Sequence, residues 1–274
     1  MTGARVLTVA AGHLGDSDDS AGRLVVRTLL AEGLHVASRQ VVDETEASLD
    51  AALHPAIEAG GLVVVLAQPG GSGGDVVRRA IARLSGTRLI LNERLLALME
   101  EDFARRGQAM PRRLDRLALL PQSAQVWPAL AGEPGWMLEV RQGVMAVLPL
   151  GSPHLAALIE GFLCPLARER FGGAEVAVLR TLRATGLAPA EAEERLGAWL
   201  GKEGEVAVSC LLVDGDVWVR LMARGASRAL AEAALAPVES AVTAALGEDC
   251  YGHDEDSLEA VVGRLLVDRA SPWP

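Results

Sequence analysis

Aromatic residues make up only 3% of this sequence, although hydrophobic residues make up 50%. The core therefore has to be built from Ala, Val and Leu rather than from large rings, so it packs through many small contacts. No apolar run reaches the roughly 20 residues that a membrane-spanning helix needs, and no charged and hydrophobic leader opens the chain. We therefore expect a cytoplasmic protein that does not contact a membrane.

Cysteine and basic charge are also scarce. Cys164, Cys210 and Cys250 are odd in number and far apart, which argues against a disulfide framework and against a compact zinc site. We expect them to be buried small hydrophobes. Lys and Arg number 26 against 36 Asp and Glu, for a net charge of −10, and they are scattered along the chain. Nucleic acid is therefore not expected as the main ligand.

Two common phosphate-binding signatures are missing as well. Gly61 to Asp75 reads GLVVVLAQPGGSGGD, in which no lysine follows Gly74 and no glycine spacing fits the dinucleotide-binding pattern. The segment still has the order of strand, glycine-rich turn and helix, with the helix beginning at Asp75, and this order gathers backbone N–H groups at a helix N-terminus. It predicts either a plain structural turn or a corner that binds phosphate or pyrophosphate on Gly70, Gly71, Ser72 and Gly73.

With 274 residues the chain is long enough for two modest domains. In residues 1–171, apolar strands alternate with amphipathic helices, as in a parallel sheet covered on both faces. We expect strands at 4–10, 35–42, 62–66, near 89, 136–140 and 144–148, and helices at 20–32, 75–84 and 153–169. A further helix ends at Ala59 and is capped by Asp43 or Thr45, and another runs through Arg106 with Asn92 as its N-cap. The first domain is thus predicted to be an α/β three-layer sandwich with a mostly parallel sheet.

The boundary between the domains is expected at Phe171-Gly172-Gly173, where two glycines end a helix. Residues 172–253 then give strands at 176–182, 206–212, 217–223 and near 250, and helices at 189–200 and 228–246. This β-α-β-β-α-β order predicts a smaller α+β, ferredoxin-like second domain. Residues 254–274 form a C-terminal helix and tail, with Asp256 as the N-cap and Glu259 completing a capping box.

Several stretches carry a family resemblance. In the first domain they are LGDSDDSAGRLVV (residues 14–26), the strand, loop and helix of residues 62–82, FARRGQAM (103–110) and ALLP (118–121). In the second they are LRT (179–181), EGEVAV (203–208), APVE (236–239) and YGHDEDSLEAVVGRLL (251–266). Jointly they resemble the CinA (competence/damage-inducible) family. That resemblance implies a molybdopterin-binding MoaB/Mog-type first domain and a homodimer.

Longer members of the family continue into a nicotinamide-nucleotide amidase domain with an AESCTGG-type motif. No such motif occurs here, so the chain is not expected to be that amidase. Its final helix resembles the opening helix of the amidase domain. Leu258, Val262 and Leu265 are therefore expected to pack on another surface, in this chain or in a partner.

The family's pocket motifs are only partly kept in this sequence. The residues that match them, and that the resemblance implies as ligand-binding, include Gly15, Asp16, Gly70, Ser72, Asp75, Pro134 and Gly135. Several acidic positions are lost. Ala10 and Ala11 stand where the family has a Thr-Glu pair, Gly74 replaces an aspartate and His154 replaces a glutamate.

Loss of these carboxylates bears on metal binding, because a divalent cation that bridges phosphates needs carboxylate or water oxygens. The remaining acids are Asp16, Asp18, Asp19 and Asp75, and we take Asp16 and Asp75 as the metal-ligand candidates for Mg, Mn or Co. The loop is not an EF-hand. The three aspartates of residues 16–19 also fit helix capping and compensation of the helix dipole, which we favour.

His13 and His154 fall in loops that the resemblance places around the pocket. Each could bind metal or act as an acid or base, and each could equally be polar loop filling. His253 is assigned to the solvated approach to the last helix. The catalytic candidates are therefore Asp75, Asp16 and His154.

Three functions follow from the sequence. The leading hypothesis is a CinA-like protein that binds a nucleotide or pterin phosphate at the glycine-rich stretch, with catalysis reduced or lost. The first alternative is a metal-dependent ADP-ribose-type pyrophosphatase, the activity that the resemblance implies for the first domain. The second alternative is a non-catalytic interaction protein that forms a homo-oligomer.

Overall fold

The computed structural model describes residues 3–10, 19–127, 133–172, 175–201 and 204–268. The chain forms two compact units, residues 1–173 and 174–274. Each has its own sheet and its own apolar core. The units are described separately below.

Unit 1 alternates strands and helices along most of its length. Its elements are β1 (Ala4–Ala10), α1 (Ser20–Ala31), β2 (Val36–Asp43), α2 (Glu46–Glu58), β3 (Gly61–Ala67), α3 (Gly71–Leu84), β4 (Leu89–Leu91), α4 (Glu93–Arg105), the 3₁₀ helix η2 (Arg112–Ala118), β5 (Leu119–Pro121), β6 (Gln125–Trp127), β7 (Gly135–Val140), β8 (Gly143–Pro149), α5 (Leu155–Leu158), the π-helical η4 (Ile159–Leu163) and α6 (Cys164–Phe171).

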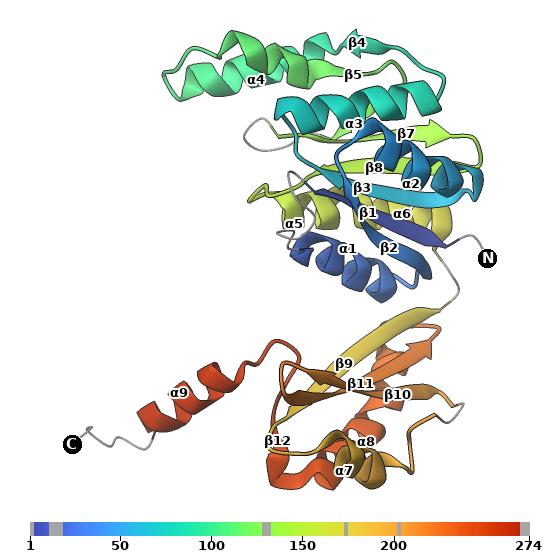
Figure 1. Cartoon of the computed structure of the whole chain (residues 1–274), viewed down its shortest axis with the longest axis vertical. Helices are drawn as coiled ribbons and strands as arrows, with labels where there is room; N and C mark the ends of the chain where they lie inside the picture. The colour runs from blue at the N-terminus through green and yellow to red at the C-terminus, as the bar shows by residue number, and fades with distance from the viewer. Residues whose placement is uncertain (1–2, 11–18, 128–132, 173–174, 202–203, 269–274) are drawn as a thin grey trace. The chain divides into compact units, whose positions relative to one another are not determined.

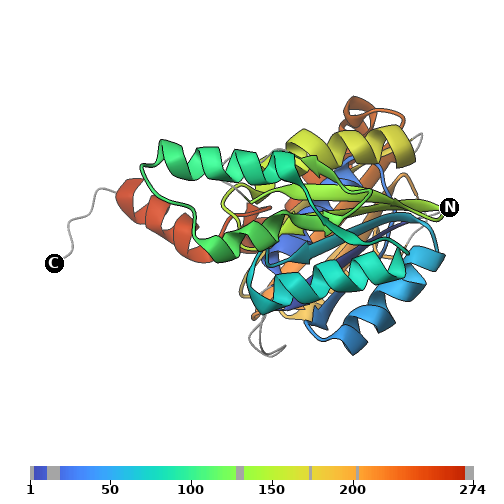
Figure 2. The same cartoon turned by 90° about the horizontal axis from the view of Figure 1, so that it is seen from above.

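The sheet of unit 1 has the order β2-β1-β3-β8-β7-β6 in the described residues. The pairs β1–β2, β1–β3 and β3–β8 are parallel, whereas β7 is antiparallel to both β8 and β6. Helices α2 and α3 run side by side on one face, and α1, α5 and α6 cover the other (Figures 1 and 2). The predicted three-layer sandwich with a mostly parallel sheet is confirmed.

The buried strands explain why the sheet is covered on both faces. All seven residues of β3 are buried, and the six side chains that follow Gly61 alternate between the two apolar clusters of unit 1. A strand that is apolar on both sides needs a helix layer above and below, because either face left in water would expose Val or Leu side chains.

Helix α3 begins earlier than the sequence predicted. We expected it from Asp75, but it runs from Gly71, so the glycines form its first turn rather than a loop. Strands β5 and β6 and the 3₁₀ helix η2 were not predicted. They are short, and β5 pairs only with β4, in a two-stranded antiparallel ladder.

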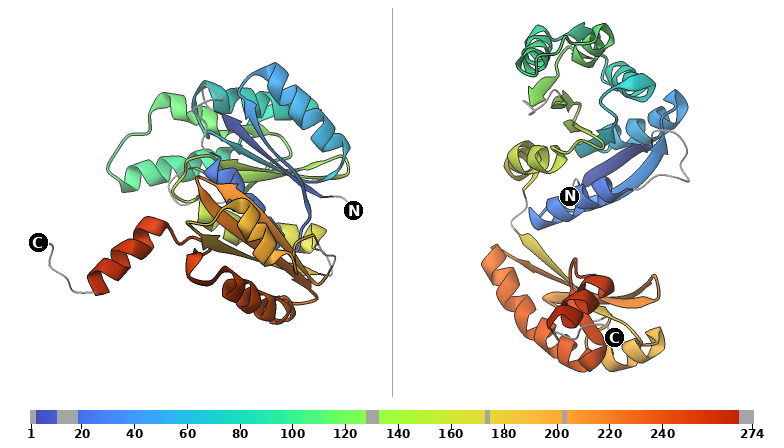
Figure 3. Two further views of the ribbon diagram at one scale, coloured as in Figure 1. Left: turned by 60° about the horizontal axis from the view of Figure 1, so that its bottom comes forward. Right: turned by 90° about the vertical axis from the view of Figure 1, so that its left-hand side faces the viewer.

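Unit 2 contains β9 (Val176–Ala184), α7 (Pro189–Leu196), β10 (Val206–Val213), β11 (Asp216–Gly225), α8 (Arg228–Leu246), the 3₁₀ helix η5 (Gly247–Asp249), β12 (Cys250–His253) and α9 (Leu258–Asp268). Its antiparallel sheet has the order β10-β11-β9-β12. Helices α7 and α8 pack on one face of it (Figure 3). This is the split β-α-β arrangement of a ferredoxin-like fold, as predicted.

The stretch Arg228–Asp249 is long and apolar enough to cross a membrane by length and composition alone. However, α8 buries Ala231, Leu235, Val242 and Leu246 in the core of unit 2. One stripe of α8 therefore belongs to this core, although only 22% of the apolar stretch is buried.

Helix α9 differs in two respects from its prediction. Ser257, rather than Asp256, caps it, because the Ser257 hydroxyl accepts from the N–H of Ala260 at 3.2 Å. The helix also buries no side chain, and Val262 and Leu265 are 45% and 54% exposed. No surface within the described residues covers them.

Candidate functional site

The strand order of unit 1 defines one open corner at the carboxyl edge of its sheet. The chain leaves β1 toward one side of the sheet, by way of α1 to β2, and leaves β3 toward the other, by way of α3 and on to β8. Ligands of open α/β sheets bind at such a switch point. The loop after β1, residues 11–18, lies outside the described residues, and with it the candidates Gly15, Asp16 and His13. The loop and helix after β3 are described in full, apart from two side chains.

The first turn of α3 is the best-defined part of this corner. Gly70 is its N-cap, in an extended conformation with φ −127°, and Gly71 follows with φ +74°, a left-handed conformation that favours glycine. An α-helix leaves the N–H groups of its first turn without intrahelical partners. The backbone of Gly71, Ser72 and Gly73 lies in that turn. The glycine-rich stretch therefore presents helix-terminal N–H groups at the sheet edge.

Gly74 sets how closely the turn packs. A Cβ atom at this position would lie 2.6 Å from the carbonyl oxygen of Gln68 and 3.0 Å from the carbonyl of Pro69. These neighbours are backbone atoms, so they cannot swing aside as a side chain would. The backbone of Gln68 and Pro69 therefore packs directly against α3 at Gly74, and this close approach is possible because residue 74 has no side chain.

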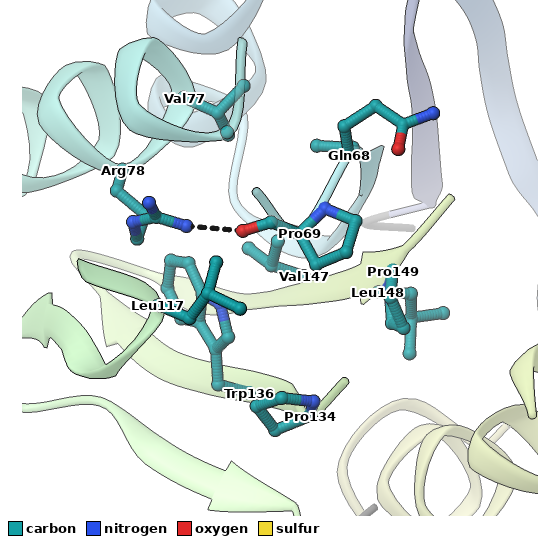
Figure 4. A pocket seen from close by; sticks show the side chains of 12 residues that line it. Gln68, Pro69, Val77, Arg78, Leu117, Pro134, Trp136, Val147, Leu148 and Pro149 are labelled. Carbon is teal, nitrogen blue, oxygen red and sulfur yellow. Dashed lines mark hydrogen bonds between the residues drawn. The ribbon is translucent and has the colours of Figure 1, made fainter. Parts of the chain in front are cut away.

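A small cavity opens beside this turn (Figure 4). Its lining comes from the ends of β3 and β8, from α3, and from η2 and β7: Ala67, Gln68, Pro69, Gly74, Val77, Arg78, Leu117, Pro134, Trp136, Val147, Leu148 and Pro149. Its volume is about 30 Å³, enough for one or two water molecules and far below the several hundred Å³ of a typical ligand pocket. The cavity formed by the described residues is therefore too small to enclose a typical ligand.

Asp75 stands at the side of the cavity and is paired with two arginines. One carboxylate oxygen contacts the guanidinium of Arg78, one turn further along α3, and the other contacts Arg116 of η2. The Asp75 side chain is 15% exposed. Both of its oxygens thus face positive charge supplied by the protein itself.

Arg78 is the most deeply buried charged residue of the described chain, with 5% exposure. Its Nη1 donates to the carbonyl oxygen of Pro69 at 2.7 Å. The Arg78 side chain therefore binds both the turn before α3 and the Asp75 carboxylate. Burial lowers the pKa of the guanidinium to about 10, and the nearby charge of Arg79 acts in the same direction. Arg78 therefore remains charged at neutral pH.

The remaining predicted residues are only partly brought together. Pro134 lines the cavity. Gly135 lies at the start of β7, where a Cβ would come within 2.9 Å of the Trp127 ring. The absence of a side chain at this position therefore leaves space for that ring. His154 precedes α5, beyond the end of β8, and its backbone N–H donates to the Ser152 hydroxyl at 3.2 Å. It is not among the described residues that line the cavity.

Asp19 forms a second buried polar contact near the same edge. The hydroxyl of Thr8, in β1, donates to Asp19 at 2.5 Å, and Arg39 of β2 lies 3.0 Å from the other carboxylate oxygen. Asp19 is the N-cap of α1 by position, but its side chain makes no capping hydrogen bond. The predicted capping role is wrong for this residue, because its carboxylate turns into the sheet instead. Asp18 lies outside the described residues.

No group of three or more His, Cys, Asp or Glu side chains in the described residues could hold a metal ion. The three cysteines are free, but only Cys164 is buried as expected, since Cys210 and Cys250 are half-buried. Burial raises the pKa of each thiol, that of Cys164 to about 11. These thiols are therefore neutral near pH 7, as expected for structural rather than catalytic cysteines.

Sequence reasoning missed Arg78 and Arg116, the two residues that set the charge of the site. Arg78 lies three residues after Asp75, and this spacing brings an acid and a base together on one helix face. That signal was available in the sequence. Arg116 carried no such signal, because η2 reaches Asp75 only through the tertiary fold.

Comparison with known proteins supplies the remaining evidence. Residues 1–167 match the family described as "Probable molybdopterin binding domain", and residues 179–252 match "Damage-inducible protein CinA KH domain". A CinA-like protein of Gloeobacter violaceus is 33% identical over 229 residues, which cover 83% of this chain and 54% of that protein. A CinA-like protein of Frankia casuarinae is 30% identical over 254 residues, covering 89% of this chain and 59% of that protein. The chain thus spans a little over half the length of these relatives.

Among solved structures, a CinA protein of unknown function from Thermoplasma acidophilum superposes with a TM-score of 0.52. Its sequence is 24% identical, and the match covers 60% of this chain and 98% of that chain. At this level of identity the likeness supports the fold alone.

Proposed function

The chain belongs to the CinA-like family, with a first unit of the molybdopterin-binding MoaB/Mog type, and on that basis we propose that it binds a nucleotide or pterin by its phosphate at the first turn of α3, with catalysis reduced or lost. The supporting observation is the meeting of helix-terminal N–H groups on Gly71 to Gly73 with two guanidinium groups at one sheet edge. Both features attract anions.

The size of the small cavity bears on the proposed position of such a ligand. Because the interior of the corner holds only about 30 Å³, the phosphate rests at the mouth and the rest of the ligand projects away from the cavity. Contact through backbone N–H groups and arginines selects a phosphate and carries little information about the group attached to it. The free thiols suit a reducing, cytoplasmic setting, which belongs to the same proposal.

Reduced catalysis is the second part of the proposal, and it concerns the acids. The one candidate metal ligand in the described residues, Asp75, has both oxygens engaged by arginines, and the described residues hold no group of three possible ligands. Hydrolysis of a pyrophosphate at a divalent cation needs a nearly octahedral set of oxygens around the metal. The metal-dependent pyrophosphatase, which would use Asp16 and Asp75, is therefore the weaker alternative.

Calorimetric titration of the folded protein with ADP-ribose, a dinucleotide and a molybdopterin analogue tests binding, and release of AMP from ADP-ribose with Mg, Mn or Co tests hydrolysis. Binding of at least one ligand without turnover is expected. Turnover that Asp75→Asn abolishes would instead establish the pyrophosphatase. If the folded protein binds none of these ligands, the proposal is refuted.

A matched pair of glycine variants locates the site. Gly71 and Gly86 both have positive φ, +74° and +66°, and a Cβ meets nothing within 4 Å at either. Alanine at each therefore strains the backbone by the same roughly 1–2 kcal/mol without a clash. Gly71→Ala, in the first turn of α3, is expected to weaken ligand binding, and Gly86→Ala, just beyond the other end of α3, is not.

Self-association is a second candidate function, favoured by α9. This helix exposes Val262, Leu265 and Leu266, at 45%, 54% and 52%, and packing them against a second copy would remove them from water. Light scattering should then give the mass of a dimer, and Leu265→Glu should give a monomer. A monomeric wild type at high concentration would count against it.

A further inference from the structure

The three charges beside the cavity do not balance. Asp75 carries one negative charge and contacts two guanidinium groups, Arg78 and Arg116, so the cluster holds one positive charge in excess. A carboxylate shared by two cations is a site where a second anion is electrostatically favoured. A divalent cation would add to the positive charge instead.

The two arginines differ in how firmly they are held. The Arg78 side chain is 6% exposed and is fixed by both Asp75 and the Pro69 carbonyl oxygen, 2.7 Å away. Arg116 is 46% exposed, and among the described residues its only carboxylate partner is Asp75. Arg116, next in sequence to the cavity-lining Leu117, is therefore the group that can exchange partners, while Arg78 stays in place.

An exchange at Arg116 leaves no buried charge unpaired. If Arg116 turns to an arriving phosphate, Asp75 keeps its contact with Arg78, and the buried Arg78 keeps its counter-ion. The unfavourable step of stranding a buried ion is avoided. The neighbouring Leu117 lines the cavity, so Arg116 lies one residue from the cavity wall.

We propose that Arg116 binds the phosphate of the ligand directly, without a divalent metal, and that Asp75 is the resting counter-ion of this arginine rather than a metal ligand. This inference rests on the function proposed above and adds the charge that recognises the ligand. A guanidinium presents two parallel N–H donors to a phosphate and is permanently charged near pH 7.

The experiment is a titration of the full chain with ADP-ribose and with inorganic pyrophosphate, each in EDTA and in excess Mg²⁺. Wild type should bind both ligands in EDTA, with no requirement for Mg²⁺. Arg116→Gln should bind roughly ten- to a hundredfold more weakly, the range for loss of a hydrogen bond to a charged group. The matched control is Arg113→Gln, an exposed arginine of the same 3₁₀ helix with no ion pair in the described residues, which should bind as wild type does.

Asp75→Asn separates the two roles by the sign of its effect. A resting counter-ion competes with the ligand, so its removal should tighten binding by up to about fivefold, the value of a partly exposed ion pair. A metal ligand would give the opposite, loss of binding together with loss of metal dependence. Circular dichroism checks that the Asp75→Asn variant is folded. If Asp75→Asn does not fold, the Arg116→Gln titration tests the proposal instead, because that substitution leaves the Asp75–Arg78 pair intact.

Binding that appears only with Mg²⁺, or that Arg116→Gln leaves unchanged, overturns this inference and leaves the phosphate site standing. If folded wild type binds neither ligand in either buffer, the proposed phosphate site is refuted, and with it the proposed role of Arg116.

Discussion

Substitution of Gly74 by alanine probes the packing on which the site depends. The added Cβ would stand 2.6 Å from the Gln68 carbonyl oxygen and 3.0 Å from the Pro69 carbonyl, whereas ordinary contacts begin near 3.4 Å. The gap must therefore widen by most of an ångström. Because both neighbours are backbone, the turn between β3 and α3 has to move as a whole. That movement pulls the Pro69 carbonyl away from Arg78, to which it is hydrogen-bonded at 2.7 Å.

Forcing an extra carbon into a packed site destabilises a protein by about 1–3 kcal/mol. For a unit of 173 residues, each kcal/mol lowers the melting temperature by about 2–4 °C. Gly74→Ala is therefore expected to lower the transition of unit 1 by roughly 4–8 °C at the middle of that range. Gly74→Asp should be at least as destabilising, so a carboxylate restored at this position would not recreate a metal site.

Differential scanning calorimetry of the full chain measures the effect, since it resolves two transitions if the units melt apart. Gly161→Ala is the control: Gly161 lies in η4, where a Cβ meets nothing within 4 Å and φ is not positive. It should not lower the stability of unit 1, because alanine at an exposed helical position is favoured over glycine by up to about 1 kcal/mol. If Gly74→Ala has the same melting temperature as wild type, the turn after β3 does not pack against α3 at Gly74, and the cavity beside it is not formed as described.

The remaining predictions concern buried polar groups. Thr8→Val should lower the stability of unit 1 by about 1–3 kcal/mol in urea unfolding, because Asp19 loses its hydroxyl donor; an unchanged midpoint would contradict this. Asp254→Ala should destabilise unit 2 similarly, since the Asp254 carboxylate accepts from the Thr181 N–H at 3.0 Å and φ there is +52°, and Asp254→Asn should restore part of the loss. Cys164, whose pKa burial raises to about 11, should be about one thousandth thiolate at pH 8 and resist iodoacetamide until the protein unfolds. Because that pKa is raised, the thiol favours the folded state below about pH 9, and this contribution is lost as the pH rises toward 11; rapid alkylation at pH 8 would refute its burial.

Much of the fold could be predicted from the sequence because it depends on local patterns. β1 and α8 lie at the predicted residues, and Asn92 and Thr45 cap the helices that follow them, with side chains that accept from Leu95 and Ser48. Apolar periodicity and capping residues act within a few positions of the chain, so one sequence is sufficient to recognise them. The site was legible only in part, since glycines mark a close approach of the backbone without saying what approaches.

By itself, the sequence determined the order of the longer strands and helices, a core in each unit rich in Ala, Val and Leu, and the gathering of glycines at a helix start. Only the tertiary structure decided that those glycines form the first turn of α3, that Gly74 admits the backbone of Gln68, and that Asp75 meets Arg116 from η2. The reason is physical. Helix and strand formation follow from short-range sterics and burial, whereas the charge of a site is a sum over side chains that only folding brings within a few ångströms of one another.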